Sequence, residues 1–310
     1  MKTFVIGSLI AFSAIAFAAP ANDGPAAECE GIKVATGPKG KGYSTLFADI
    51  QKVTGKQIPL CEVNTAGGLD NLNALSTKEA DIGFVQIDTW TDMKNGDENI
   101  AALQYVLPMN NNYLHIVTSV SGFKVIADKK FFGKDEKIVV INRFSDLRNQ
   151  RVALVGSAQL LGRRLDKMLG YGIQFVDAKD DATAFDMVAK GQAAAAFTVS
   201  GWPSGTVKNL NQNSGLTLVP FDAPINEPYK VKALNYKNIA VYNNNSLAIP
   251  NVLVTRPFTG QRLANVSAIQ AAIVKNLTEL KEGNYQPAWN EVNPAGAVTG
   301  MTKFKPANSK

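Results

Sequence analysis

The stretch Thr36–Ser44, "TGPKGKGYS", contains three glycines whose spacing is close to that of a phosphate-binding loop. In loops of the G-x-x-x-x-G-K-[ST] type, backbone N–H groups wrap the phosphates and the lysine reaches the outer ones. Gly37 and Gly42 have the required spacing, but Tyr43 stands where the lysine belongs. The G-x-G-x-x-G pattern of dinucleotide-binding loops also fails, because Thr45 replaces its third glycine. The glycines therefore indicate close approach of the backbone to a solute, and none of them demands a phosphate.

The chain lacks the sequence motifs of the common hydrolase classes. It contains neither a G-x-S-x-G nucleophile elbow nor an H-E-x-x-H zinc motif. His115 is the only histidine and lies inside an apolar segment, so we expect a core or hinge residue rather than a base. Asp81 and Asp88 lie near a predicted strand, and Asp81 is expected to cap a turn between helix and strand. The sequence predicts no catalytic residue, no metal site and no cofactor.

The N-terminus has the pattern of a secretory signal peptide. Lys2 is followed by an apolar run from Phe4 and then by Ala16-Phe17-Ala18, an A-x-A cleavage pattern. We expect residues 1–18 to be a signal peptide that is cleaved after Ala18. No cysteine follows the apolar run, so a lipid-anchored form is not expected. The predicted location is the periplasm.

The length that remains after cleavage is about right for two lobes, since single cores stop growing beyond roughly 250–300 residues. Removal of Lys2 with the leader lowers the formal net charge from +6 to +5. The cations are scattered singly along the chain, which disfavours nucleic-acid binding. A mild positive charge is compatible with an anionic small solute, although surface lysines alone explain it equally well.

The chain has two cysteines, Cys29 and Cys61. An even pair in an exported protein most simply forms one disulfide. Cys29 precedes the first predicted strand and Cys61 lies in the second, so we expect a structural bridge between the chain entry and the sheet.

The hydrophobic pattern alternates between strands and helices in two similar halves. A strand at 32–36 enters the glycine loop and a helix from about Ser44, and the pattern then repeats. The further predicted strands of both halves are 58–63, 82–85, 151–155, 173–178 and 193–201. Such β-loop-α repeats predict parallel sheets covered by helices, here in two similar lobes.

Two predicted strands stand outside this repeat. Residues 112–120 and 249–258 have no helix beside them and flank the second half. We expect these strands to carry the chain into the second lobe and back. One long amphipathic helix, with apolar residues from Leu263 to Leu280 on one stripe, is expected to close the fold.

The candidate site consists of the polar and glycine-rich stretches that end the predicted strands. Ligands of parallel α/β sheets bind at the carboxyl ends of strands, where helix N-termini present free N–H groups. We therefore expect an anionic or zwitterionic solute in a cleft between the lobes. The predicted ligand-binding residues are Thr36, Gly37, Lys39, Gly40, Gly42, Tyr43, Thr65, Gly67, Gly68, Asn71, Gln86, Asp88, Gly156, Ser157, Gln159, Ser200, Gly201 and Trp202.

Three of these residues, Tyr43, Asn71 and Gln86, are expected to converge on one solute. Tyr43 offers an aromatic wall or a hydroxyl group, and the amide of Asn71 is expected to reach into the cleft. Substituting Asn71 or Gln86 should then weaken binding and leave folding nearly unaffected. In the alternative interpretation Asn71 merely caps its helix.

Several segments resemble the solute-binding receptors of the TAXI group of TRAP transporters. "TGPKGKGY" resembles the glycine-rich opening of that family, and "NTAGGLDNLNAL...KEADIGFVQID" is similar to its GG-x-x-N-L segment with the strand that follows. "LRNQRVALVGS", "AKGQAAAAFTVSGWP" and "IPNVLVTR" resemble its later segments. The resemblance extends from about Ile32 to Ile273, and an insertion-like stretch covers residues 124–144.

The resemblance implies an α/β, two-lobed type II periplasmic-binding-protein fold with two hinge strands. Each lobe is then a mostly parallel sheet flanked by helices. Lobe I is expected at 31–116, lobe II at 117–250, and the return to lobe I with the C-terminal helix at 251–304. The implied function is a receptor that captures a small organic anion or amino-acid-like solute for the membrane permease of a TRAP-type transporter. A secreted enzyme and a surface interaction protein that reuse this fold are the alternatives.

Overall fold

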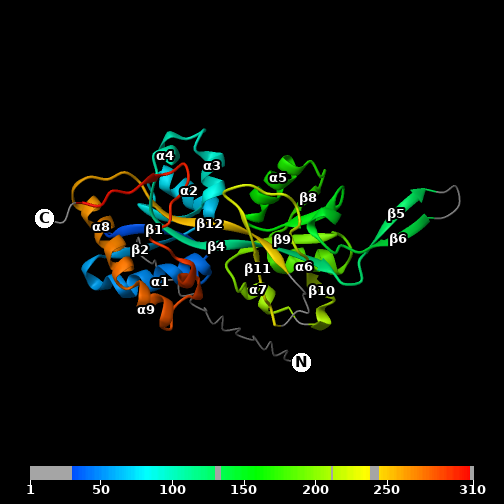
Figure 1. Cartoon of the computed structure of the whole chain (residues 1–310). Coiled ribbons are helices and arrows are strands. Elements are labelled where there is room, and N and C mark those ends of the chain that lie inside the picture. Colours follow the sequence, from blue (N-terminus) through cyan, green and yellow to red (C-terminus); the bar gives the residue numbers. More distant parts are fainter. Residues whose placement is uncertain (1–29, 130–133, 211, 238–243, 308–310) are drawn as a thin grey trace, which may run out of the picture. The chain divides into compact units, whose positions relative to one another are not determined.

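The computed structural model describes residues 30–129, 134–210, 212–237 and 244–307 (Figure 1). Residues Gly31–Lys310 form one compact unit. The predicted signal peptide and Cys29 lie outside the described residues, so the cleavage site and the disulfide to Cys61 stay predictions. None of the described helices is long and apolar enough to span a bilayer.

The first half of the chain forms the predicted β-loop-α repeat. Its three parallel strands lie in the order β2-β1-β3. The elements are β1 (Ile32–Gly37), α1 (Gly42–Thr54), β2 (Leu60–Asn64), α2 (Gly68–Ser76), β3 (Ile82–Gln86), α3 (Ile87–Met93) and α4 (Glu98–Ala101). Helix α1 buries Leu46, Phe47 and Ile50 on one face, as the apolar spacing predicted.

The second half repeats this arrangement, with the parallel strand order β9-β7-β8. Its elements are β7 (Arg151–Leu154), α5 (Ala158–Leu169), β8 (Gln174–Asp177), α6 (Asp181–Ala189), β9 (Ala195–Ser200), α7 (Gly205–Lys208), β10 (Leu216–Leu218) and β11 (Lys230–Ala233). Helix α5 ends at Gly170, which has the left-handed conformation that glycine adopts readily.

Two long antiparallel strands join the halves. Strand β4 (Gln104–Ser119) and strand β12 (Asn245–Thr255) pair with each other in the middle of the sheet. Strand β3 pairs with β12, and β9 pairs with β4, so each half is attached to a different one of the two strands. These are the two strands that the sequence placed at 112–120 and 249–258. Strand β4 starts earlier than predicted and continues through Pro108 to the polar run Asn110–Asn112.

Two regions differ from the sequence-based expectation. The insertion-like stretch contains a hairpin of β5 (Phe123–Lys129) and β6 (Lys134–Val139), which forms a two-stranded sheet of its own (Figure 1). The prediction of a single C-terminal helix was wrong, because the segment divides into α8 (Gly260–Lys275) and α9 (Leu277–Glu282). The break is at Asn276, whose side-chain amide donates to the carbonyl of Ala272.

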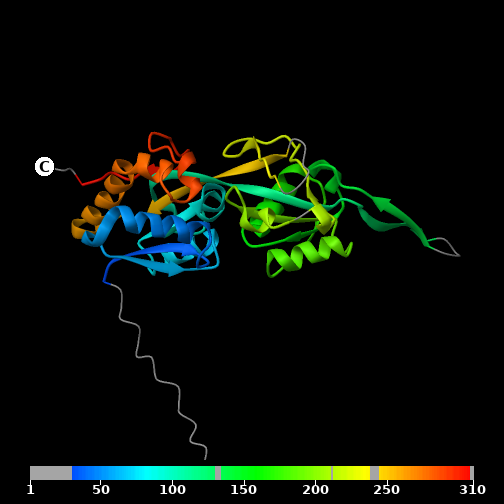
Figure 2. The same ribbon diagram turned by 90° about the horizontal axis from the view of Figure 1, so that it is seen from below.

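Helices cover both faces of the sheet in the first half. Helix α1 lies beside α8 (Figure 2), and both pack with Phe84, Leu253 and Trp289 in one core cluster. Helices α2 and α4 lie over the opposite face with Val85 and Val252. The core therefore joins residues from both ends of the chain.

Asp81 is a buried charge that ties the start of β3 to the chain after β12. Its side chain is 2 % exposed, and Arg256 Nη2 and Arg262 Nη1 lie 2.7 and 2.6 Å from its Oδ1. The backbone N–H of Lys33 donates to Oδ2 at 3.1 Å. The expected role as a turn cap was therefore wrong, because both carboxylate oxygens serve groups distant in the sequence.

We expect Asp81→Asn to lower the free energy of unfolding by about 3 kcal/mol, because breaking a buried ion pair leaves a charge uncompensated. Urea denaturation measures the loss. Asp186→Asn is the matched control: this carboxylate pairs with Lys190 on an exposed helix face, where loss costs at most about 0.5 kcal/mol. Equal losses in the two variants would contradict the role of Asp81.

His115 lies in the core of the second half and is fully buried. Its Nε2 is 2.7 Å from the hydroxyl oxygen of Tyr236, which also accepts the backbone N–H of Ser204 at 2.8 Å. The imidazole and the tyrosine hydroxyl therefore share one hydrogen bond. Burial lowers the pKa of His115 to about 4. The sequence-based expectation of a core histidine is confirmed.

Because the pKa of His115 is lower in the folded state, the unfolded chain binds the extra proton between about pH 6.5 and pH 4. Neutral His115 therefore makes its full contribution to the free energy of unfolding above pH 6.5. This contribution, about 3 kcal/mol in total, is lost as the pH falls. Carboxylates titrate in the same range, so the difference between wild type and His115→Gln isolates this residue. Parallel stability curves of the two proteins between pH 7 and 4 would refute the assignment.

Candidate functional site

The strand-end loops of the two halves meet. A Cβ atom added at Gly37 would lie 3.4 Å from the Cα of Gly67, and one at Gly67 would lie 3.8 Å from the Ser157 hydroxyl. A Cβ atom at Gly68 would lie 3.6 Å from Oε1 of Gln86. Gly37 and Gly67 have φ of 82° and 144°, which L side chains rarely adopt. Loops from both halves, each leading into a helix, thus converge as predicted.

Both the ring and the hydroxyl group of Tyr43 make contacts within the protein. Its ring stacks on Phe84 with 5.2 Å between the centroids. Its hydroxyl accepts from Asn112 Nδ2 at 3.0 Å and donates to Asn251 Oδ1 at 2.8 Å, and burial raises its pKa. Tyr43 thereby fixes the orientation of the Asn251 amide.

This orientation leaves one buried donor without a partner. Asn251 is 1 % exposed, and its Nδ2 has no hydrogen-bond partner among the described residues. Asn251 is directly opposite Gln86 across the β12–β3 pair, so both side chains lie on the same face of the sheet. Asn112 lies on that face too, because it is opposite Ile249, two residues before Asn251. The face therefore carries a row of amides that leads to the glycine loops.

Asn71 does not reach into a cleft, and this expectation was wrong. The residue is fully buried. Its Oδ1 accepts from the Thr65 hydroxyl at 2.6 Å, and its Nδ2 donates to the carbonyl of Phe84 at 2.7 Å. It is not the helix cap either, since Gly67 precedes α2. Asn71 ties the loop before α2 to strand β3.

Asn71→Ala should therefore destabilise the fold, contrary to the expectation from sequence. The substitution removes the side-chain donor of the Phe84 carbonyl and one acceptor of the Thr65 hydroxyl, which costs about 1–3 kcal/mol. Thermal and urea unfolding measure it. Asn73→Ala, at an exposed position of the same helix, is the control. A wild-type melting temperature for Asn71→Ala would restore the original interpretation.

Asp88 joins the two halves. Its Oδ1 accepts the backbone N–H of Thr89 at 2.7 Å, and its Oδ2 accepts the Tyr229 hydroxyl at 3.0 Å. Arg164 of α5 donates to the Asp88 carbonyl at 2.8 Å and pairs with Asp92 at 3.1 Å. Burial raises the pKa of the Asp88 carboxyl. The side chain is committed to protein contacts, not open to a solute as expected.

The remaining predicted residues have mixed positions. Thr36 donates its hydroxyl to Glu62 at 2.8 Å, and Thr65 donates to Asn71, so both serve the protein interior. Lys39, Gly40 and Gly42 are exposed at the entry of α1. Gly156 and Gln159 flank Ser157 at the start of α5.

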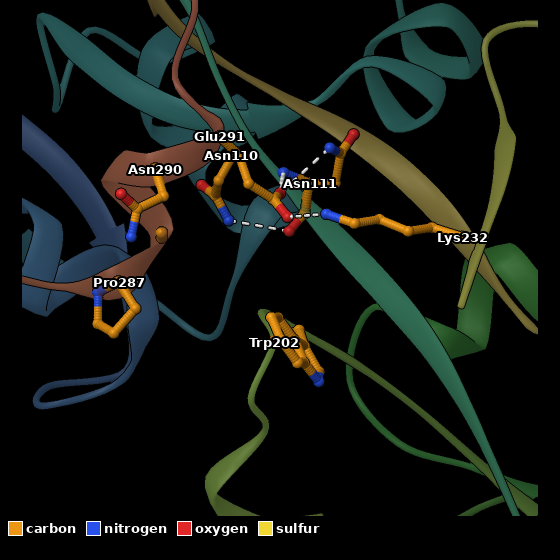
Figure 3. Close-up of a pocket in the computed structure, with 8 residues that line it drawn as sticks. Asn110, Asn111, Trp202, Lys232, Pro287, Asn290 and Glu291 are labelled. Carbon is orange, nitrogen blue, oxygen red and sulfur yellow. Dashed lines mark hydrogen bonds and ion pairs between the residues drawn. The ribbon is translucent and has the colours of Figure 1, made fainter. Parts of the chain in front are cut away.

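A cavity of about 240 Å³ lies beside β4, between the chain after β9 and the 3₁₀ helix at Pro287–Glu291 (Figure 3). Of the predicted residues only Trp202 lines it, with 38 % of its surface exposed. The full lining comprises Asn110, Asn111, Trp202, Lys232, Pro287, Ala288, Asn290 and Glu291.

Glu291 is the fixed charge of this cavity. Its Oε2 accepts the backbone and side-chain N–H groups of Asn111 at 2.9 and 3.2 Å. Its Oε1 accepts the Tyr113 hydroxyl and pairs with the Lys232 ammonium. Burial alone would raise the pKa of Glu291, but the hydrogen bonds from Lys232 and Tyr113 outweigh it and lower the pKa. The carboxylate is therefore held ionised.

Tyr113, which donates to Glu291 of the cavity, lies on the face of the central sheet opposite the amide row. Ser200 is opposite Tyr113, and Tyr113 is opposite Ala248, the neighbour of Ile249 on β12. Since neighbouring strand residues point to opposite faces, Ser200 and Tyr113 lie on the face away from Gln86. The predicted residues therefore do not all lie on one face of the sheet.

Sequence reasoning missed the asparagines of β4, Asn251, Lys232 and Glu291. A polar run inside an otherwise apolar strand, "MNNNY", was the available signal for the first of these. Nothing local marks Glu291, which is 180 residues from Asn111 in the sequence. Within the described ranges, no group of three or more His, Cys, Asp or Glu side chains is arranged to hold a metal ion.

Two solved structures illustrate the similarity of the fold. The GluR0 ligand-binding core, solved in complex with L-glutamate, has 12% identity and a TM-score of 0.51, over 84% of this chain and 99% of that one. The amino acid ABC transporter substrate-binding protein AbpA from Streptococcus pneumoniae, bound to L-arginine, has 10% identity and a TM-score of 0.50, over 84% of this chain and 94% of that one.

These similarities confirm the two-lobed α/β periplasmic-binding-protein fold, although the strands of both halves belong to one mixed sheet rather than to two mostly parallel ones. The NMT1-like family matches residues 34–303, which is most of the described chain. The chain belongs to the NMT1-like family.

Proposed function

We propose that the protein is a periplasmic solute-binding receptor, which captures a small organic anion or amino-acid-like solute and delivers it to a membrane permease. Within this class we assign it to the TAXI group, so that the permease is of the TRAP type. The similar structures were solved with L-glutamate and L-arginine, which supports a solute of amino-acid size. The resemblance of "TGPKGKGY" and "GFVQID" to TAXI receptors supports the narrower assignment.

The convergence of strand-end loops from both halves is the observation that carries the proposal. Gly67 precedes α2 and Ser157 precedes α5, and the two residues are in close proximity. Free N–H groups at the starts of both helices favour a negatively charged group between them. The unpartnered Asn251 Nδ2 adds a buried donor on the Gln86 face.

Capture is proposed to involve closure of the lobes about β4 and β12, which are the only described strands that pair within both halves. Export and removal of residues 1–18, and the bridge between Cys29 and Cys61, belong to the same proposal. An enzyme and an interaction protein are the less favoured functions, because the described site offers hydrogen-bond donors without an arrangement of nucleophile and base.

Asn251→Asp tests the donor. Aspartate keeps the oxygen that accepts from Tyr43, but it removes Nδ2 and adds a negative charge. Loss of one hydrogen bond to a charged group costs about 1.5–3 kcal/mol, so affinity for an anion should fall roughly 10- to 150-fold. Isothermal titration with succinate and L-glutamate measures this, after native mass spectrometry of the purified protein has identified any bound solute.

Two further variants make the result decisive. Asn73→Asp adds the same charge at an exposed position of α2 and should bind like wild type. Gln86→Ala should weaken binding about 5- to 150-fold, and Gln57→Ala, also exposed, should not. If wild-type protein carries no solute and binds no member of a carboxylate and amino-acid panel, the receptor function is refuted. If it binds a solute whose affinity is unchanged by both Asn251→Asp and Gln86→Ala, the proposed site is misplaced.

A further inference from the structure

The cavity beside β4 contains a fixed anion and a movable cation. Glu291 is 18 % exposed and has three donors besides Lys232: the two N–H groups of Asn111 and the Tyr113 hydroxyl. Lys232 is 46 % exposed and stands on β11 at the mouth of the cavity. Figure 3 shows its side chain extended toward Glu291. If the ammonium leaves, the carboxylate stays in place.

A second polar atom of the cavity lacks a partner. Asn110 is 4 % exposed, and its Nδ2 donates to the carbonyl of Asn111 at 2.9 Å. That bond fixes the amide and identifies the other atom, Oδ1, as the acceptor, and Oδ1 has no partner among the described residues. A buried acceptor of this kind is stabilised by a donor N–H or O–H group.

Trp202 supplies the third element. Its indole lines the cavity and is partly exposed, whereas Trp90 and Trp289 are buried. The face of a tryptophan ring attracts cations more strongly than any other side-chain ring. A carboxylate, a free carbonyl oxygen and an indole face share one preference, which is a ligand that carries N–H donors and a positive charge.

We propose that this cavity is a second binding site, specific for the ammonium group of a small solute. The Lys232 ammonium is a tethered substitute for that group: it occupies Glu291 and is displaced when the solute's own ammonium binds between Glu291, Asn110 Oδ1 and the Trp202 ring. At about 240 Å³ the cavity is smaller than the usual range of drug-sized pockets, which suits a small amine. Gln86, Asn251 and the glycine loops are absent from the lining of the cavity, so it is separate from the proposed receptor site.

The substitution Lys232→Met tests the proposal most directly, because methionine keeps an unbranched chain and removes the competing charge. L-lysine is the probe, and hexanoate, which has the same carbon chain and carboxylate but no ammonium group, is the negative probe. Release of a half-exposed ion pair is worth about 1 kcal/mol, so Lys232→Met should bind L-lysine about fivefold more tightly than wild type. Lys230→Met removes an exposed charge from the same strand and should bind like wild type.

Two variants remove the recognition elements. Glu291→Gln should abolish L-lysine binding, and Trp202→Phe should abolish the change in tryptophan fluorescence that accompanies it. Trp202→Phe affects a partly exposed side chain, so it keeps the test valid if Glu291→Gln does not fold. Isothermal titration and fluorescence titration give the two readouts.

The outcomes separate this site from the receptor site. Gln86→Ala should leave L-lysine affinity unchanged, and Lys232→Met should leave succinate affinity unchanged. Unchanged or weaker L-lysine binding by Lys232→Met, equal binding of hexanoate, or dependence of L-lysine binding on Gln86 would each overturn the inference. A wild-type protein that carries no solute and binds no member of the carboxylate and amino-acid panel other than L-lysine would refute the receptor function and leave this test standing.

Discussion

The antiparallel pairing of β4 with β12 is the interaction on which the rest of the structure depends. These strands are long enough to run through both halves, and each carries the parallel strands of one half on its outer edge. The glycine loops are positioned only through this pairing, because β3 lies against β12 and β9 against β4. The register shifts between Pro250 and Val252 occur in the middle of the pair, at Asn251. The strand bend and the unpartnered amide therefore share one location.

The same pairing explains why polar residues tolerate burial here. The middle of a strand that runs between two lobes is not covered by the hydrophobic core of either lobe. Polar side chains in the middle of the strand must therefore form hydrogen bonds across the sheet or with the loops. Asn112, Tyr43 and Asn251 form a chain of hydrogen bonds that meets most of this requirement. On the opposite face, Asn111 and Tyr113 meet it with Glu291. Among the buried atoms without a partner in the described chain are Asn110 Oδ1, Asn251 Nδ2 and Ser200 Oγ, which mark where the protein offers hydrogen bonds to something else.

Features with a local signal could be predicted from the sequence. The alternation of strands and helices, the end of α5 at Gly170 and the approach of Gly37 to Gly67 all follow from spacing and glycine geometry. The direction of single side chains could not be predicted, because it depends on distant partners. Tyr43 bonds to a residue 208 positions away, and Asn71 bonds to a carbonyl on another strand. Both residues looked like solute ligands only while those partners were unknown. The break at Asn276 could not be predicted, because the apolar stripe of the helix continues across it.

The topology also governs the order in which the chain acquires structure during synthesis or translocation. The second half is continuous between β4 and β12, and its parallel strands find their first partner in β4, which precedes them. The first half cannot complete its core until later. Strand β3 pairs with β12 and helix α1 packs against α8, and both of these partners follow the whole second half in the chain. Until then its apolar strand edge and the face of α1 stay uncovered, and such surfaces favour aggregation. The first half is therefore synthesised first and completes its core last.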